Sequence, residues 1–388
     1  MTWFKKVTGA ALAVIIAAGL MAGCGGSKKE AANEITVGAS FELTGNVANY
    51  GKSTLNGFKL GIEEINKSGG INGKQIRIVE SDNKSEPAEA GNAVTKIITQ
   101  DRVVAVVGPA TSGCVAASEP IATASKIPLI APCATAPEIT VGKDGKVKPF
   151  IFRAAFIDPF QGKVMADFAL NNLKVKKVAI LNDASSDYSK GLAQVFRNEV
   201  ESRGGTVVLQ EAFLAKDIDF KAALTKIKAA NPDAIYIPGY YEEVAKIIKQ
   251  AREMGIKAPL LGSDGWDSPK LVEIAGAAAV NNTFFSNAYS AEDPDPGVQK
   301  FIKLYRDKYQ KTPDVFALEG YNAALILANA MKKAGTEGPK LAEAIAQTKD
   351  LAVPNGTFSY DKDHNPITTA LIIEMVNGKQ SVREKIGG

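Results

Sequence analysis

The sequence predicts an α/β protein with two lobes, each built on a doubly wound parallel sheet. Apolar, β-branched runs alternate with amphipathic stretches along most of the chain, and strands separated by helices of about 10–15 residues indicate βαβ units. The run VVAVV at 103–107 is apolar throughout, which suits a parallel strand covered on both faces. Right-handed crossovers make such sheets doubly wound. The strands are too many for one sheet of this kind, so we expect two lobes.

The elements follow one another in a regular order. Ile35–Phe41 alternates apolar with small or polar residues, as strands do. Within 52–66, apolar residues recur at helical spacing until Ser68-Gly69-Gly70 ends the pattern. The same reasoning predicts strands at 75–80, 103–107, 127–131, 177–182, 205–212, 233–238 and 259–262, a final β section containing 369–375, and helices at 88–99, 114–125, 160–172, 189–203, 219–230, 241–254, 297–309, 315–334 and 339–347.

Residues 1–23 are predicted to be an export signal rather than part of the fold. A basic start precedes the almost wholly apolar Val7–Ala22, which is shorter than the ~20 residues of a spanning helix. The ending Leu20-Met21-Ala22-Gly23-Cys24 resembles a bacterial lipobox, which implies cleavage before Cys24 and lipid on its sulfur. Residues 24–33 then form a flexible tether. The alternative is a plain secretory signal that leaves Cys24 as an incidental thiol.

Two breaks divide the body that begins at residue 34. The first lies at Pro149–Arg153, after a loop rich in Lys and Gly at 141–148. The second lies at Asn287–Pro296, where acidic residues and prolines interrupt the pattern. The segments after the second break could return to the first lobe, and periodicity leaves this open.

Composition excludes several classes of function. The chain of 388 residues carries 46 basic and 42 acidic residues, and a balance this close to zero argues against nucleic acid as the main partner. One histidine in the whole chain makes a His-based metal site or a catalytic triad hard to assemble. That residue, His364, lies in a predicted turn at 361–366, and we expect it at the surface. No phosphate-binding glycine loop, nucleophile elbow or calcium loop is complete. We therefore expect no cofactor, no metal and no enzymatic activity.

Polar and aromatic residues gather where the predicted strands end. Ligands of open α/β sheets bind at the carboxyl ends of strands. In the first lobe, 108–113 and 132–138 present hydroxyls and backbone N–H groups beside a helix start, which suits an anion such as a carboxylate. In the second lobe, 183–188, 239–241 and 263–266 supply tyrosines and a carboxylate. This division matches an α-amino acid, which carries a carboxylate beside an ammonium group.

Each of these signals also has a structural interpretation. Ser112 and Thr135 could be ordinary helix N-caps. Tyr188 and Tyr240 could be packing residues with a hydrated hydroxyl, and Asp264 could be a turn residue. Their shared location at strand ends favours a binding site.

The whole body resembles a known family, the type I periplasmic-binding fold, in its leucine/isoleucine/valine-binding branch of ABC-transporter substrate-binding proteins. The segments that carry the resemblance are Gly38–Gly45, Gly69–Gly73, Gly108–Gly113, Ala134–Glu138, Asp187–Leu192 and Ser263–Trp266. The resemblance implies two lobes joined by three crossovers that close on a ligand. It therefore assigns 34–153 plus 288–357 to lobe 1 and 154–287 plus 358–388 to lobe 2. It also implies a monomer, periplasmic or cell-surface, that delivers a small amino acid to a membrane permease driven by ATPases.

The family's site residues carry over by motif. Ser112, Thr135 and the backbone around Cys133 are expected to hold the ligand carboxylate and part of the ammonium, and Asp264 to take the ammonium. The remaining expected contacts are Tyr188 and Tyr240, which close over the ligand, Tyr50 and Phe316, which touch its side chain, and Trp266, which narrows the pocket. Related branches bind short amides or organic acids, and the same fold can act as a ligand sensor, so these stay as alternatives.

The cysteines depart from the family's pattern. Cys114 and Cys133 fall in two ligand loops that the resemblance makes neighbours. An exported compartment permits a disulfide between them. We expect this bridge, and the alternative is two small buried thiols.

Overall fold

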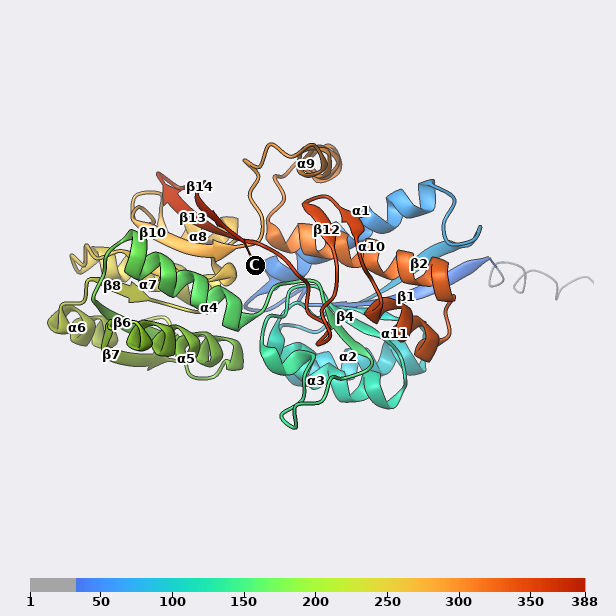
Figure 1. Ribbon diagram of the computed structural model, residues 1–388, viewed down its shortest axis with the longest axis horizontal. Coiled ribbons are helices and arrows are strands. Elements are labelled where there is room, and N and C mark those ends of the chain that lie inside the picture. Colours follow the sequence, from blue (N-terminus) through green and yellow to red (C-terminus); the bar gives the residue numbers. More distant parts are fainter. Residues whose placement is uncertain (1–32, 388) are drawn as a thin grey trace, which may run out of the picture.

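The computed structural model describes residues 33–387, and within this range the chain forms two lobes that lie side by side (Figure 1). The predicted signal peptide, most of the tether and Cys24 lie outside the described residues. One lobe holds a five-stranded sheet and the other a seven-stranded sheet. No helix of the described part is long and apolar enough to cross a membrane.

The first sheet is parallel throughout, with strand order β2-β1-β3-β4-β5. Its elements are β1 (Glu34–Phe41), α1 (Ala48–Lys67), β2 (Gln75–Asp82), α2 (Pro87–Thr99), β3 (Val106–Val107), α3 (Ser112–Ala124), β4 (Leu129–Ala131) and β5 (Ile151–Arg153). The predicted strand at 103–107 is shortened to its last two residues, although the backbone at Val104 and Ala105 still hydrogen-bonds to β1. The predicted break at 149–153 contains the edge strand β5, the last strand of this sheet before the chain passes to the second lobe.

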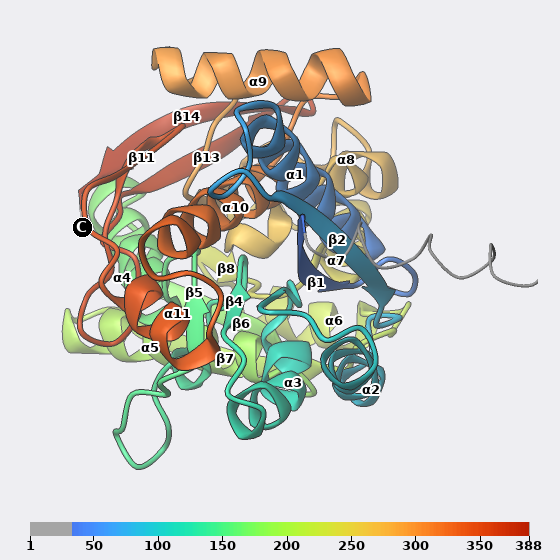
Figure 2. The same ribbon diagram turned by 90° about the vertical axis from the view of Figure 1, so that its right-hand side faces the viewer.

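Three later helices return to the first lobe. These are α9 (Pro296–Tyr309), α10 (Val315–Ala334) and α11 (Gly338–Ala346), followed by the hairpin β11 (Leu351–Val353) and β12 (Gly356–Phe358). Helix α10 packs along α1 (Figure 2). The two backbones approach closely because glycines lie at the contact: a Cβ on Gly57 would come 1.8 Å from the Ala317 oxygen, and one on Gly320 would come 2.1 Å from the Thr54 oxygen.

The second sheet has the order β14-β13-β10-β9-β8-β6-β7. Its elements are α4 (Asp158–Asp167) with a π-helical continuation (Phe168–Asn172), β6 (Lys177–Asp183), α5 (Asp187–Ser202), β7 (Thr206–Phe213), α6 (Lys221–Ala230), β8 (Ala234–Tyr236), α7 (Tyr241–Glu253), β9 (Leu260–Gly262), α8 (Pro269–Ala275), β10 (Thr283–Asn287), β13 (Ala370–Val376) and β14 (Lys379–Ile386). Five strands are parallel, and the C-terminal hairpin adds β13, antiparallel to β10, and β14, antiparallel to β13. The strand β10 and the helix α8 were not predicted.

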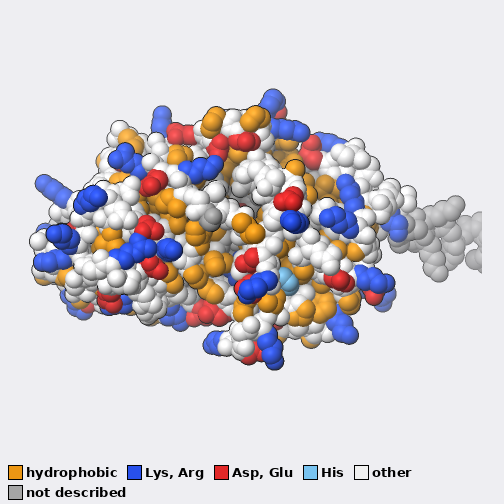
Figure 3. Space-filling model, viewed as in Figure 1, with side chains coloured by type: hydrophobic (Ala, Val, Ile, Leu, Met, Phe, Trp, Pro, Cys, Tyr) orange, Lys and Arg blue, Asp and Glu red, His pale blue; other side chains and the backbone are white. Residues whose placement is uncertain are grey.

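The chain passes between the lobes after β5, after β10 and again before β13. The last passage comes later than the boundary at 358 that we expected, because Tyr360 and His364 still pack on Phe152 of the first lobe. On the face shown in Figure 3, basic and acidic side chains are interspersed over both lobes.

The expectation that His364 lies at the surface is wrong. Its side chain is buried, its ring stacks on Phe152 at 4.4 Å between centroids, and its Nδ1 lies 2.9 Å from the Ile151 oxygen. Burial lowers the pKa of His364, which favours the neutral ring. The turn folds back over the edge strand β5, and such a cover protects an exposed sheet edge.

Candidate functional site

A cavity lies between the two lobes, at the carboxyl ends of their strands. About 240 Å³ of space there, with the open solvent at its mouth included, is filled by no protein atom. It is lined by Tyr50, Ala110, Thr111, Ser112, Cys133, Thr135 and Phe316 of the first lobe and by Tyr188, Tyr240, Asp264 and Gly265 of the second. The structure therefore brings together every predicted ligand residue except Trp266.

Trp266 does not line the cavity, and its predicted role is wrong. Its ring is fully buried in the core of the second lobe, and its Nε1 donates a hydrogen bond to the Ile237 oxygen at 3.0 Å. It packs over Gly262, where a Cβ would lie 2.1 Å from the ring. Asp264–Trp266 forms a single 3₁₀ turn, and this turn directs Asp264 to the cavity while Trp266 anchors the loop.

The first turn of α3 borders the cavity, as expected for an anion site. The first N–H groups of a helix have no partner within it, and the helix dipole favours negative charge there. Neither Ser112 nor Thr135 acts as an N-cap: the Ser112 hydroxyl accepts a hydrogen bond from the Ala136 N–H at 3.3 Å, across two ligand loops. Both side chains are buried at the cavity.

Glu42, which sequence reasoning missed, fixes the loop before α3. Its buried carboxylate accepts hydrogen bonds from the N–H groups of Ala110 and Thr111, both at 3.0 Å, and from the Thr111 hydroxyl at 2.7 Å. The protein's own carboxylate thus takes two backbone donors of this loop. Its place directly after β1, at a carboxyl strand end, was the signal that could have found it.

Arg153 fixes the second ligand loop in the same way. Its guanidinium is fully buried and donates to the oxygens of Ala134 and Ala136 at 3.1 and 2.8 Å, on either side of Thr135. Burial lowers the pKa of Arg153 to about 10, so the group stays charged at neutral pH. The sequence pattern marked this residue only as part of a break between lobes.

Asp264 supplies the negative charge from the opposite lobe. Its Oδ1 accepts hydrogen bonds from the Tyr188 hydroxyl at 2.6 Å and from Gln161 Nε2 at 3.0 Å. Burial raises the pKa of Asp264 to about 6, while these hydrogen bonds oppose the rise. Gln161 was not predicted, because a glutamine in a helix carries no signal of its own.

Aromatic side chains close the cavity from both lobes. Tyr188 and Tyr240 stack with ring centroids 5.1 Å apart, and Tyr50 packs on Phe316 at 4.2 Å. The Tyr50 hydroxyl crosses the cleft: it donates to the Gly265 oxygen and accepts from the Tyr241 N–H at 3.1 Å. Burial raises the pKa of Tyr50, Tyr188 and Tyr240 alike, so their hydroxyls stay neutral hydrogen-bonding groups.

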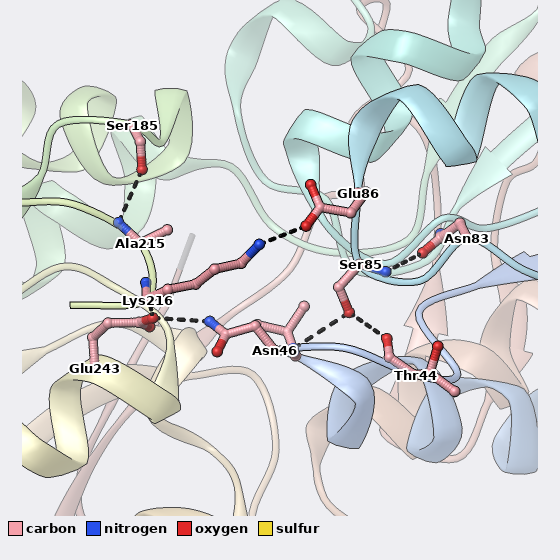
Figure 4. A network of polar contacts seen from close by, with 10 residues as sticks. Thr44, Asn46, Asn83, Ser85, Glu86, Ser185, Ala215, Lys216 and Glu243 are labelled. Atoms are coloured by element: carbon pink, nitrogen blue, oxygen red, sulfur yellow. Dashed lines mark hydrogen bonds and ion pairs between the residues drawn. The ribbon is translucent and has the colours of Figure 1, made fainter. Parts of the chain in front are cut away.

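A second set of contacts joins the lobes away from the cavity, and we call it the interlobe latch (Figure 4). Asn46 Nδ2 of the first lobe donates to Glu243 Oε1 of the second at 2.8 Å, and the same oxygen accepts from the Lys216 N–H at 2.7 Å. The Lys216 ammonium pairs with Glu86 of the first lobe at 2.6 Å. Together with the bridging Tyr50, these contacts indicate that the lobes are closed.

The expected disulfide is not formed. Cys114 and Cys133 are both free and buried. Their neighbours differ: the Cys133 sulfur lies 3.3 Å from the Thr54 hydroxyl of α1, whereas Thr111 and Glu42 surround the Cys114 sulfur. Burial raises the pKa of both thiols, so the alternative of two small buried thiols is the correct one.

Known proteins resemble this chain in both sequence and structure. Residues 34–380 match the family described as "Periplasmic binding protein". A leucine-, isoleucine-, valine-, threonine- and alanine-binding protein of Pseudomonas aeruginosa is 32% identical over 333 residues, which cover 86% of this chain and 87% of that protein.

Two solved structures share the fold over nearly their whole length. The branched-chain amino acid transporter substrate-binding protein LivJ of Streptococcus pneumoniae, in complex with isoleucine, is 41% identical with a TM-score of 0.85, and covers 91% of this chain and 99% of its own. The leucine-binding protein LivK of Thermotoga maritima is 34% identical with a TM-score of 0.86 over the same shares. The chain therefore belongs to the periplasmic binding protein family, in the branch of leucine/isoleucine/valine-binding proteins, whose members bind ligands rather than catalyse reactions.

Proposed function

We propose that this protein is the extracytoplasmic substrate-binding component of an ABC importer and that it binds a branched-chain L-amino acid between its two lobes. The observation that carries the proposal is the division of charge across one cavity. The first lobe offers hydroxyls and a helix N-terminus, and the second offers the carboxylate of Asp264. An α-amino acid presents the complementary pair of charges within a few ångströms.

Each end of the ligand then has a partner. The ligand carboxylate binds Ser112, Thr135 and the first turn of α3, where the dipole favours an anion. The ammonium binds Asp264. The aliphatic side chain packs against Tyr50 and Phe316, whose rings form the apolar wall of the cavity.

Ligand binding and lobe closure are coupled in this arrangement. A ligand shifts a conformational equilibrium only by its extra affinity for one state. Seated on Ser112 and Thr135, it gains the contacts with Asp264, Tyr188 and Tyr240 only when the second lobe closes. The closed protein then delivers the amino acid to a membrane permease powered by ATPases.

The rest of the proposal concerns attachment. Cleavage before Cys24 and lipid on its sulfur would tether a monomeric body to a membrane surface, in the periplasm or at the cell surface. Mass spectrometry of the protein from membranes tests this, because diacylation of the Cys24 peptide is the expected result and an unmodified thiol contradicts it.

Thermal-shift screening of the ligand-stripped body tests the ligand. Binding to the folded state alone stabilises it by about 2.7 kcal/mol at a hundredfold excess over Kd. Leucine, isoleucine and valine should each raise Tm in the wild type and fail to do so in Asp264→Asn. The matched control is Asp233→Asn, since Asp233 receives backbone hydrogen bonds outside the cavity. Stabilisation by amides or organic acids alone would overturn the assignment of an amino acid.

A further inference from the structure

Gln161 bridges two buried acids beside the cavity. It lies in the first turn of α4 and is fully buried. Its Nε2 donates to Asp158 Oδ1 at 2.9 Å and to Asp264 Oδ1 at 3.0 Å. Its Oε1 accepts from the Ser286 hydroxyl at 2.8 Å and from the Asp264 N–H at 3.3 Å. An amide has two donor hydrogens and two acceptor sites, so all are occupied and the group has one orientation.

This arrangement leaves one oxygen of Asp264 for a ligand. Both side-chain donors, Gln161 and Tyr188, use Oδ1. Among the described residues, no side chain donates a hydrogen bond to Oδ2, although Asp264 lines the cavity. Gln161 and Tyr188 therefore hold Oδ1, and the backbone of Gly265 also lowers the pKa of the carboxylate. Oδ2, which has no side-chain donor, remains an acceptor.

Hydrogen bonds from Tyr188, Gln161 and Gly265 favour the ionised form of Asp264, against its burial and the charge of Asp267. When two carboxylates share a buried site, the pKa of one rises well above that of the other. Burial raises the pKa of Asp158 to about 8, with the charge of Asp264 adding to the rise and Arg153 opposing it. The pKa of Asp264 rises less, to about 6, although Asp267 nearby also raises it. Of the two acids, Asp158 therefore takes up a proton first as the pH falls, which leaves the negative charge on Asp264.

We propose that Gln161 is a positioning residue that fixes the Asp264 carboxylate, so that Oδ2 accepts the ammonium of the ligand and the site selects ligands with a protonated amine. This inference rests on the proposed function and deepens it. Gln161 does not line the cavity itself, so it acts on the ligand through the carboxylates that it holds.

The test compares leucine with 4-methylpentanoate, the same molecule without its amino group, by isothermal titration calorimetry. Gln161→Met keeps a similar volume and removes the amide. We expect the Kd for leucine to rise about 10-fold, the factor that 1.4 kcal/mol gives, while the Kd for 4-methylpentanoate changes less than about twofold. Gln347→Met, on the exposed end of α11, is the matched control.

The pH dependence of the leucine Kd separates a positioning role from a packing role, because a change in packing alone would leave it unchanged. With one donor lost, the pKa of Asp264 rises, so leucine binding by Gln161→Met should weaken at a higher pH than in the wild type. Ser286→Ala removes only the hydroxyl that orients the amide and should shift both measurements in the same direction by a smaller amount. If Gln161→Met does not fold, Ser286→Ala serves as the test of the positioning role in its place.

Two outcomes would overturn the role of Gln161. One is an equal loss of affinity for both ligands, and the other is a leucine Kd and pH profile that match the wild type. If the wild type itself binds no amino acid, the proposed function fails instead, so the two failures are distinguishable.

Discussion

We predict that a substitution in the interlobe latch, away from the cavity, weakens ligand binding. Asn46→Ala removes the hydrogen bond that Asn46 donates across the cleft to Glu243. Glu243 is only 2% exposed, and after the substitution its carboxylate keeps the Lys216 N–H as a partner. None of these residues lines the cavity, so any change in affinity must come from the closing equilibrium.

The structure sets the size of the effect. A hydrogen bond to a charged group contributes about 1.5–3 kcal/mol, and this one exists only when the lobes are closed. If the ligand binds tightly only to the closed state, the whole loss appears in Kd, which should rise about 10-fold or more. The ion pair between Lys216 and Glu86 is well exposed, so it contributes little beyond this.

Isothermal titration calorimetry gives the Kd, and stopped-flow fluorescence gives the rate of ligand release, which should increase by a similar factor. The matched control is Asn171→Ala, which removes an asparagine–carboxylate hydrogen bond to Asp167 within one lobe. An Asn46→Ala protein with the wild-type Tm and a Kd within about twofold of wild type would refute the reasoning.

Three further predictions follow from the site and the core. Leucine affinity should fall as the pH drops through about 6, because burial raises the pKa of Asp264 to about 6 and protonation removes the charge that the ammonium needs; calorimetry across this range measures it, and a flat profile contradicts it. Gly57→Ala should destabilise the fold by about 1–3 kcal/mol in urea unfolding, because the new Cβ would lie 1.8 Å from the Ala317 oxygen. The control Gly191→Ala, with its nearest neighbour at 3.9 Å, should be neutral or slightly stabilising. Denatured, unreduced protein should take up one alkyl group at each of Cys114 and Cys133, whereas peptide mapping that finds either thiol blocked would restore the disulfide.

Local pattern predicted most of the fold because most elements carry their own periodicity. Helix α10 occupies 315–334, the same bounds that its apolar spacing indicated. The strand β10 (TFFSN) is short and partly polar, and it becomes a strand only because β9 and β13 pair with it on either side. Such an element depends on tertiary neighbours that lie far away in the sequence.

The residues of the candidate site also fall into those that local pattern predicts and those that depend on distant segments. Residues that project into the cavity from strand ends, such as Ser112 and Tyr188, follow from the rule that parallel sheets bind ligands there. Glu42, Arg153 and Gln161 act by holding those residues through buried hydrogen bonds. Glu42 at least follows a strand end. No local pattern marks Arg153 or Gln161, because the function of each exists only once distant segments meet.

The glycine contact between α1 and α10 has a consequence for how the specificity of such a protein can change. These helices carry Tyr50 and Phe316, the apolar wall of the cavity. Their separation is fixed by Gly57 and Gly320, further along each helix from the cavity-lining residues. Tyr50 and Phe316 thus determine the shape of the cavity wall, while Gly57 and Gly320 determine the distance between the two helices. A new side chain at 316 would alter the ligand that fits, while the helices that carry it stay in place.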